Sequence, residues 1–98
     1  MSDTIDGLTI AFSEDGIETT KELDKQVLSK GAWTTIIFRY QDWDKTKQQF
    51  GPMKYSIRRY QKRNNQYWQK SKFNISSNDQ ATKIINALSD WLKLDVEK

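Results

Sequence analysis

The chain has 98 residues, a net charge of +3, and neither cysteine nor histidine. Without these residues it lacks disulfides, thiolate chemistry, the usual zinc ligands and any serine or cysteine nucleophile paired with histidine. This length predicts one small domain whose modest core favours self-association.

Charge is divided unevenly along the chain. Residues 1–25 hold seven acidic side chains and two lysines, a net charge of −5, which leaves +8 for residues 26–98. Separate acidic and basic regions indicate electrostatic contact with an anion, for which the acidic region is a candidate competitor. We therefore predict an acidic N-terminal tail or arm over residues 1–25 and a single domain over residues 26–98.

The sequence of the N-terminal region is compatible with either a short strand or a short helix. Leu8, Ile10 and Phe12 alternate with polar residues, as in a short strand. Residues 19–28 also fit the start of a short helix, because their apolar side chains have helical spacing and a glycine follows. The sequence leaves both assignments open.

A strand is predicted over residues 32–44. Its alternation puts Ile36, Phe38 and Tyr40 on one side, and the other side is also partly apolar, as in a central strand or one that touches a partner. A polar connection with a Gly-Pro turn signal follows over residues 44–52. The lysines of this connection, which are either solvated or within reach of a bound backbone, are Lys45 and Lys47.

The next stretch is predicted to be a hairpin around Asn64 and Asn65, because asparagine accepts the positive φ of such turns. A two-residue loop with regular pairing would put Lys72 opposite Ile57 and mix the two faces. A three-residue loop puts Phe73 opposite Ile57 instead. We therefore predict an odd-length loop or a bulge.

This hairpin, residues 55–76, is predicted to have one apolar face and one face that combines cations with aromatic rings. Like charges side by side across strands lower stability, so their clustering indicates a polyanionic ligand. The alternative is a solvated face whose lysines oppose aggregation, but the interleaved rings favour a binding face. Its predicted members are Lys54, Arg58, Tyr60, Lys62, Trp68, Lys70 and Lys72, with Arg39 and Trp43 from the preceding strand if that strand continues the same face.

An amphipathic helix is predicted after residue 76. Ser77, followed by Gln80 three residues later, forms a capping box, which marks a helix start. The apolar stripe of this helix is large for a sheet of three or four strands to cover alone, so we expect part of it to meet a second copy. The residues predicted at this dimer interface are Ile84, Leu88, Trp91 and Leu92.

Catalytic and cofactor signatures are lacking in the sequence. Its four glycines are too scattered for a phosphate-binding loop. Asp42 and Asp44 are the nearest pair of strand-end carboxylates. In basic surroundings we expect them to offset the neighbouring positive charge rather than to bind a metal. We expect no catalytic residues, no metal and no cofactor, and hence a protein that is not an enzyme.

The order of elements resembles the C-terminal domain of the eukaryotic transcription coactivator positive cofactor four and its small bacterial and bacteriophage relatives, over residues 26–94. Residues 55–60 are similar to the family's apolar-x-Ile-Arg-x-Tyr strand, and residues 72–76 to its Lys-Gly-Ile-Ser strand end. Gln61 stands where the family often has tryptophan, so Trp68 would have to supply that ring from the other strand. The lack of a serine-rich activation region indicates a phage or bacterial member.

The resemblance implies an α+β fold, with a curved antiparallel sheet of about four strands, one C-terminal helix, a two-fold dimer and binding of single-stranded DNA. The chain departs from the family pattern at Phe73 and Asn74, which replace a single glycine, and in its shorter hairpin loop. By position, the resemblance implies DNA contacts for Arg39, Arg58 and Lys72, and loosely for Lys45 and Lys47.

We therefore predict a homodimeric, non-catalytic protein that binds single-stranded DNA in replication, recombination or transcription. Lysines and arginines would contact phosphates, and bases would stack on Tyr60, Trp68 and Trp43. Three alternatives remain: an RNA-binding module that uses the same face, an adaptor that docks acidic replication or transcription proteins by charge, and, third, a nuclease. Because the sequence has neither an apolar signal segment nor a membrane span, we expect it in the cytoplasm or nucleoid, or in the host cytoplasm if it is phage-encoded.

Overall fold

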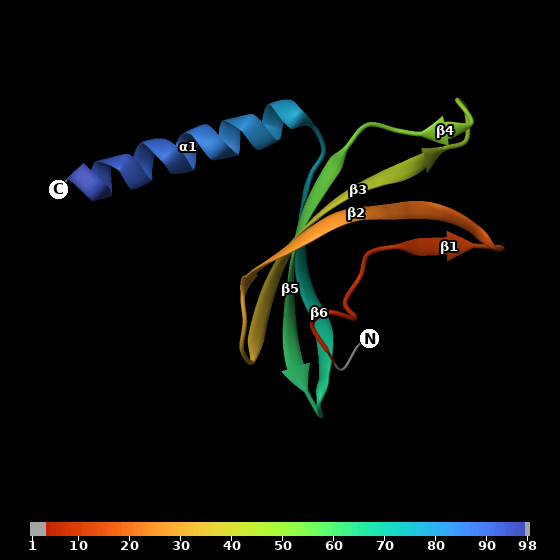
Figure 1. The fold of residues 1–98 in the computed structure, drawn as a ribbon, viewed down its shortest axis with the longest axis horizontal. Helices are drawn as coiled ribbons and strands as arrows, with labels where there is room; N and C mark the ends of the chain where they lie inside the picture. The colour runs from red at the N-terminus through yellow and green to blue at the C-terminus, as the bar shows by residue number, and fades with distance from the viewer. Residues whose placement is uncertain (1–3, 98) are drawn as a thin grey trace.

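The computed structural model describes residues 4–97, and the side chains of residues 4–93. It has an α+β fold in which a curled antiparallel sheet is followed by a C-terminal helix (Figure 1). The sheet order is β1-β2-β3-β5-β6, and the short strand β4 pairs with the end of β3. This confirms the predicted class and the antiparallel sheet. The elements are β1 (Phe12–Glu14), β2 (Ile17–Ser29), β3 (Trp33–Asp44), β4 (Gln49–Phe50), β5 (Lys54–Arg63), β6 (Gln66–Ile75) and α1 (Asn78–Glu97).

Strand β2 corrects the expectation for the N-terminal region. Residues 19–28 are extended and not helical, and the domain boundary expected between residues 25 and 26 falls inside this strand. Its threonines and valine suit a strand, and pairing with β3 provides partners for its backbone groups. The register shifts between Glu22 and Asp24 and again between Val27 and Ser29, which hides the two-residue period in the sequence.

The sheet has two faces that differ in what covers them. Side chains paired directly across strands point to the same side, so the register assigns each residue to a face. We call one the arm face, because the N-terminal arm, residues 4–11, lies on it, and the other the helix face, because α1 begins there. The arm face includes Ile36, Phe38, Tyr40, Ser56, Arg58, Tyr60, Lys62, Tyr67 and Lys72; the helix face includes Trp33, Ile37, Arg39, Tyr55, Ile57, Arg59, Gln61, Trp68, Phe73 and Ile75.

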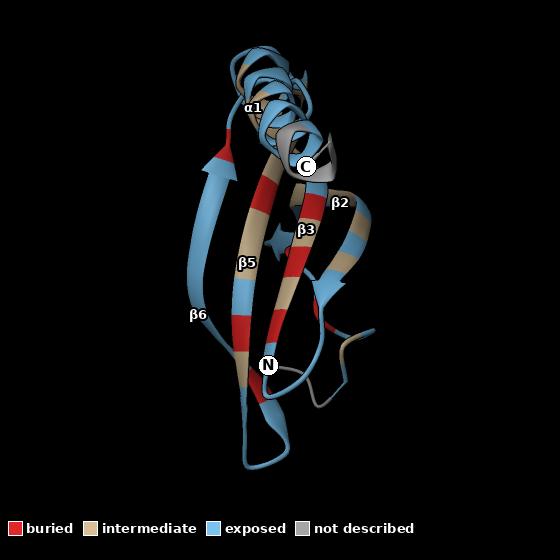
Figure 2. Cartoon of the chain, turned by 90° about the vertical axis from the view of Figure 1, so that its left-hand side faces the viewer, coloured by how far each residue is buried: buried red, intermediate tan, exposed pale blue. Residues whose placement is uncertain are grey.

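The core lies on the arm face, under the N-terminal arm. Leu8 and Ile10 are buried there although they precede β1 and belong to no strand. Buried residues occupy every second position of β3 from Thr34 to Tyr40, and two positions of β5 that are four residues apart, as expected for strands with one covered face (Figure 2). The sheet residues that form one buried cluster with Leu8 and Ile10 are Ile36, Phe38, Tyr40, Tyr60 and Tyr67.

The hairpin of β5 and β6 combines a two-residue turn with a bulge. Asn64 and Asn65 have φ values of 52° and 64°, and Arg63 pairs with Gln66 across the turn. The register then shifts between Arg59 and Tyr60, where β6 contains one extra residue. The predicted bulge is confirmed, whereas the three-residue loop is wrong. Beyond the bulge Ile57 faces Phe73, as predicted.

Helix α1 begins at the predicted capping box and then leaves the sheet. The Gln80 amide donates to Ser77 Oγ at 3.1 Å, and Gln80 Oε1 accepts from the Ser76 amide at 3.2 Å. The helix touches the sheet mainly through β6 and projects away from it (Figure 1). No helix in the described part of the chain is long and apolar enough to cross a membrane.

Candidate nucleic-acid interface

The β5–β6 hairpin lies in the most basic stretch of the chain. Between Asp44 and Asp79 the sequence has nine lysines and arginines and no acidic residue. Of the hairpin cations, Lys54 alone forms an ion pair with a described acidic side chain, that of Asp42, at 3.2 Å. The remaining positive charge is therefore not neutralised within the described residues, and it attracts anions.

On the arm face, Arg58 and Lys72 lie directly opposite each other. Arg58 Nε donates to Ser56 Oγ at 3.2 Å, and its Nη1 donates to Gln69 Oε1 at 3.0 Å. The hydroxyl of Ser56 donates to Asn74 Oδ1 at 2.7 Å. These hydrogen bonds hold the guanidinium of Arg58 in place on the same face as the exposed side chain of Lys72. The two predicted phosphate contacts are thus brought together on one face.

The tyrosines of the arm face are covered by the arm. Tyr60 is only 4% exposed, and burial raises the pKa of its hydroxyl, with Glu22 adding to this effect and Arg58 opposing it. Tyr67 is buried beside it, and Lys62 Nζ lies 5.5 Å from the centre of its ring. Tyr60 therefore has no face free for a base, contrary to its predicted stacking role. The arm face offers cations without an open aromatic ring.

Trp68 lies on the other face of the hairpin, and here the sequence prediction was wrong. The bulge reverses the alternation of β6, so Trp68 pairs with Gln61 on the helix face rather than sharing a face with Arg58. The residue is 40% exposed. A shallow pocket of about 260 Å³ beside the ring is lined by Arg63, Asn64, Trp68 and Lys70.

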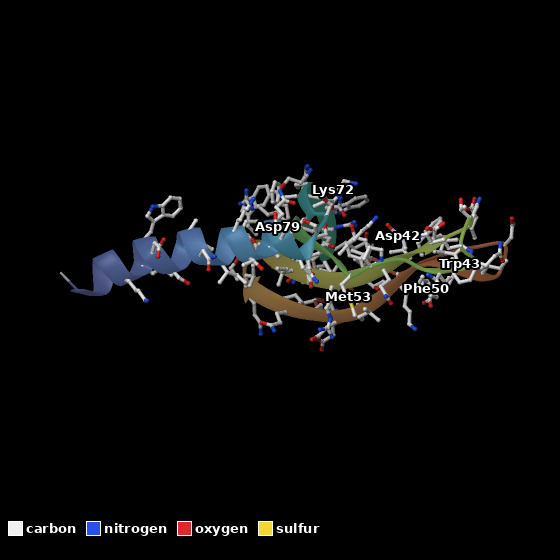
Figure 3. All side chains as sticks on the ribbon, turned by 90° about the horizontal axis from the view of Figure 1, so that it is seen from above. Asp42, Trp43, Phe50, Met53, Lys72 and Asp79 are labelled. Atoms are coloured by element: carbon white, nitrogen blue, oxygen red, sulfur yellow. The ribbon has the colours of Figure 1, made fainter. Side chains whose placement is uncertain are left out.

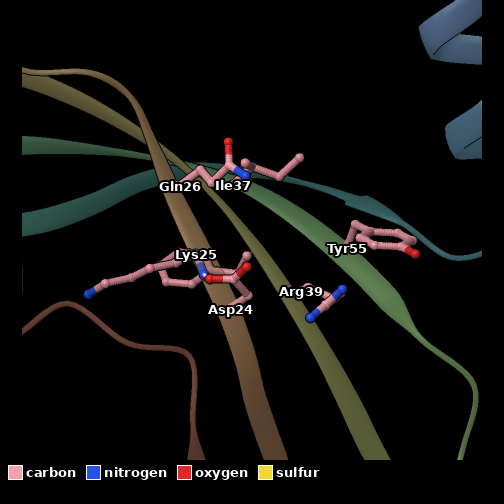
Figure 4. A pocket seen from close by; sticks show the side chains of 7 residues that line it. Asp24, Lys25, Gln26, Ile37, Arg39 and Tyr55 are labelled. Carbon is pink, nitrogen blue, oxygen red and sulfur yellow. Dashed lines mark hydrogen bonds between the residues drawn. The ribbon is translucent and has the colours of Figure 1, made fainter.

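The two predicted residues of β3 are separate from these cations. Arg39 is on the helix face and lines a shallow pocket of about 250 Å³ with Asp24 and Tyr55 (Figure 4). Trp43 packs edge-on against Phe50, with ring centres 5.2 Å apart, at an end of the molecule remote from Lys72 (Figure 3). Lys45 and Lys47 are exposed in the turn between β3 and β4.

Four residues of the helix face were missed by the sequence analysis. Arg59 lies over the indole of Trp33, with its guanidinium carbon 4.6 Å from the ring centre. Gln61 is paired with Trp33 on one side and with Trp68 on the other, and Arg63 lines the pocket beside Trp68. The Asn-Asn pair indicates a two-residue turn. A two-residue turn followed by a bulge would have placed these four residues together on one face.

Comparisons of this chain with protein-family models, with curated protein sequences and with solved structures gave no significant match. Within the described residues, no group of three or more acidic side chains is arranged to hold a metal ion. The candidate site is therefore defined by its geometry and charge: cations on both faces of the hairpin, and exposed tryptophans on the helix face.

Proposed function

We propose that this protein binds single-stranded DNA along the β5–β6 hairpin and catalyses no reaction there. The observation that carries the proposal is the exposed indole of Trp68, which lies beside Arg63 and Lys70 in a stretch without acidic residues. Only unpaired bases present an open face to such a ring, and stacking contributes roughly 1–3 kcal/mol per base. Aromatic rings next to unpaired cations are the combination that such ligands require.

The position of β6 supports a path for the DNA. This strand forms an edge of the sheet, so a bound strand that follows it can reach both faces. Phosphates would contact Arg58 and Lys72 on the arm face, and a base would stack on Trp68 on the helix face. Other proposed phosphate contacts are Lys62, Arg63 and Lys70. Single strands arise in replication, recombination and transcription, and the proposal concerns the binding step common to them.

We also propose that the binding unit is a homodimer formed through α1. The helix and the helix face enclose an open groove of about 570 Å³, whose lining includes Ile57, Ile75 and Ile84. Farther along the helix, Leu88, Trp91 and Leu92 are exposed, with Trp91 at 63%. Apolar side chains grouped in this way are stabilised when a second surface removes them from water.

The direct test is titration of a fluorescently labelled oligo-dT with the protein, followed by anisotropy. Trp68→Ala is expected to weaken binding about tenfold or more, because it removes one stacking surface. Trp43→Ala is the matched control, since Trp43 packs against Phe50 away from the hairpin, and should bind like the wild type. Equal affinities for wild type and Trp68→Ala would overturn the proposal.

The same assay separates the alternative ligands. Tighter binding of oligo-U than of oligo-dT would replace DNA by RNA as the ligand, because stacking and phosphate contacts do not distinguish the sugars. Binding of an acidic peptide without binding of either oligonucleotide would instead identify an adaptor that docks by charge. Circular dichroism of each variant shows whether the fold is kept.

A further inference from the structure

Three helix-face residues form a row across three strands. Trp33 of β3 pairs with Gln61 of β5, which pairs in turn with Trp68 of β6. Residues paired in this way share a face, and two strand spacings put the first and last Cα atoms roughly 10 Å apart. Both tryptophans are exposed, Trp33 at 42% and Trp68 at 40% of the residue. The row thus presents two exposed rings with an amide between them.

The first ring of the row already holds a flat cation. The guanidinium of Arg59 lies over Trp33 at 4.6 Å, in a cation–π contact. Arg59 itself is exposed, and forms no ion pair or hydrogen bond with a described side chain. The guanidinium thus contacts the indole on one side, and its exposed remainder is available to a ligand. Guanidinium planes and indoles are both surfaces on which unpaired bases stack.

The amide at the middle of the row has no hydrogen-bond partner among the described residues. Gln61 is half-buried, and its side chain forms no hydrogen bond with a described residue. An amide has two donors and an acceptor, and one that is half-buried gains from a partner. Flanked by two rings, this amide is within reach of the edge of a base that stacks on either ring.

We propose that the row of Trp33, Gln61 and Trp68 is a base-reading platform for two adjacent unpaired nucleotides. One base stacks on Trp68 and its neighbour on the pair formed by Arg59 and Trp33, while the amide of Gln61 hydrogen-bonds to a base edge. The ring contacts accept any base, whereas the amide contact depends on which groups the base edge presents. This inference rests on the proposed function, and adds to it a second stacking position and a means of base preference.

The second stacking position is tested with Trp33→Ala in the oligo-dT assay. We expect affinity to fall about fivefold or more, comparable to the loss of one stacked base, while Trp43→Ala binds normally. Arg59→Ser, an exposed substitution that keeps Trp33, should also weaken binding. If Trp68→Ala weakens binding and both Trp33→Ala and Arg59→Ser do not, the platform is refuted while the proposed function stands. If all three bind like the wild type, the proposed function itself has failed.

The reading role of Gln61 is tested with oligonucleotides of dA, dC and dT of equal length. We expect the wild type to bind them with affinities that differ by about threefold or more, and Gln61→Leu to reduce this spread to within about twofold. Leucine keeps a side chain of similar size without hydrogen-bonding groups. If the affinities for the three oligonucleotides differ equally in both proteins, or do not differ in the wild type, the role of the amide is refuted.

Discussion

Lys25 shows how one side chain holds the N-terminal arm on the sheet. Its ammonium donates to the carbonyl oxygens of Ile5, Asp6 and Leu8, at 3.3, 2.8 and 2.7 Å. Beside it, Glu22 Oε1 accepts from the Thr9 hydroxyl at 2.6 Å and from the Ile10 amide at 3.2 Å. An irregular segment has no ladder to pair its backbone groups, so two charged side chains from β2 provide that pairing.

We expect Lys25→Met to lower the free energy of unfolding by about 1–3 kcal/mol, because it keeps the apolar stem but leaves three carbonyls without their donor. Urea denaturation followed by tryptophan fluorescence measures the change. Lys30→Met is the matched control, since Lys30 is exposed and forms no ion pair or hydrogen bond with a described residue. Similar midpoints for the two variants would show that the arm does not depend on Lys25.

The β5–β6 hairpin shows which features of the fold are determined by local sequence. The asparagines at positive φ, the need for a bulge and the pairing of Ile57 with Phe73 were all readable from residues close in sequence. The position of Trp68 was not. The two-residue turn lets Tyr67 share the arm face with Tyr60, where the distant Leu8 and Ile10 cover both. The residue pattern of the hairpin alone does not reveal this packing, because Leu8 and Ile10 are distant in the sequence.

Strand β2 was not predicted from the sequence, for a related reason. Its two register shifts interrupt the alternation that marks a strand, and its charged residues resemble those of a tail. In the fold, two of those charges, Lys25 and Glu22, are the contacts that hold the arm. The candidate site was predicted in part: the cations of the hairpin follow from composition, whereas their division between two faces depends on the bulge.

The turn itself is open to a sharp test. Asn65 has a φ of 64°, a region that disfavours any residue with a Cβ other than asparagine or aspartate. Asn65→Ala should therefore lower the free energy of unfolding by about 1–2 kcal/mol, while Asn65→Gly should leave it unchanged or raise it. Urea denaturation of the two variants compares them directly. Equal stability of the alanine and glycine variants would contradict the positive-φ turn.

The positive charge that is not neutralised within the described residues predicts that DNA binding depends steeply on salt concentration. For single strands, the logarithm of the affinity falls by roughly 0.7 per phosphate contact for each tenfold rise in salt concentration. With about five phosphates contacted, the affinity should therefore fall about a hundredfold between about 50 and 200 mM salt. Lys72→Ala should make the dependence of log affinity on log salt concentration shallower by roughly 0.7, the contribution of one phosphate contact. Lys83→Ala is the control, because Lys83 pairs with Asp79 on α1 at 3.3 Å. A weak salt dependence would mean that the hairpin cations do not contact phosphates.

The uneven covering of the two sheet faces predicts self-association. The arm covers core residues on one face of the sheet, whereas α1 projects away from the other face (Figure 1). The apolar side chains of the helix at Leu88, Trp91 and Leu92 are exposed. For a chain of 11.6 kDa, light scattering at micromolar concentration should give twice that mass. Leu88→Lys puts a charge on the exposed apolar stripe and should give the single-chain mass, because burying an unpaired charge is strongly unfavourable. Ser89→Lys, on the polar side of the same helix, should remain dimeric. A wild type of 11.6 kDa would exclude the dimer, and the hairpin of one chain would then have to bind the single strand alone.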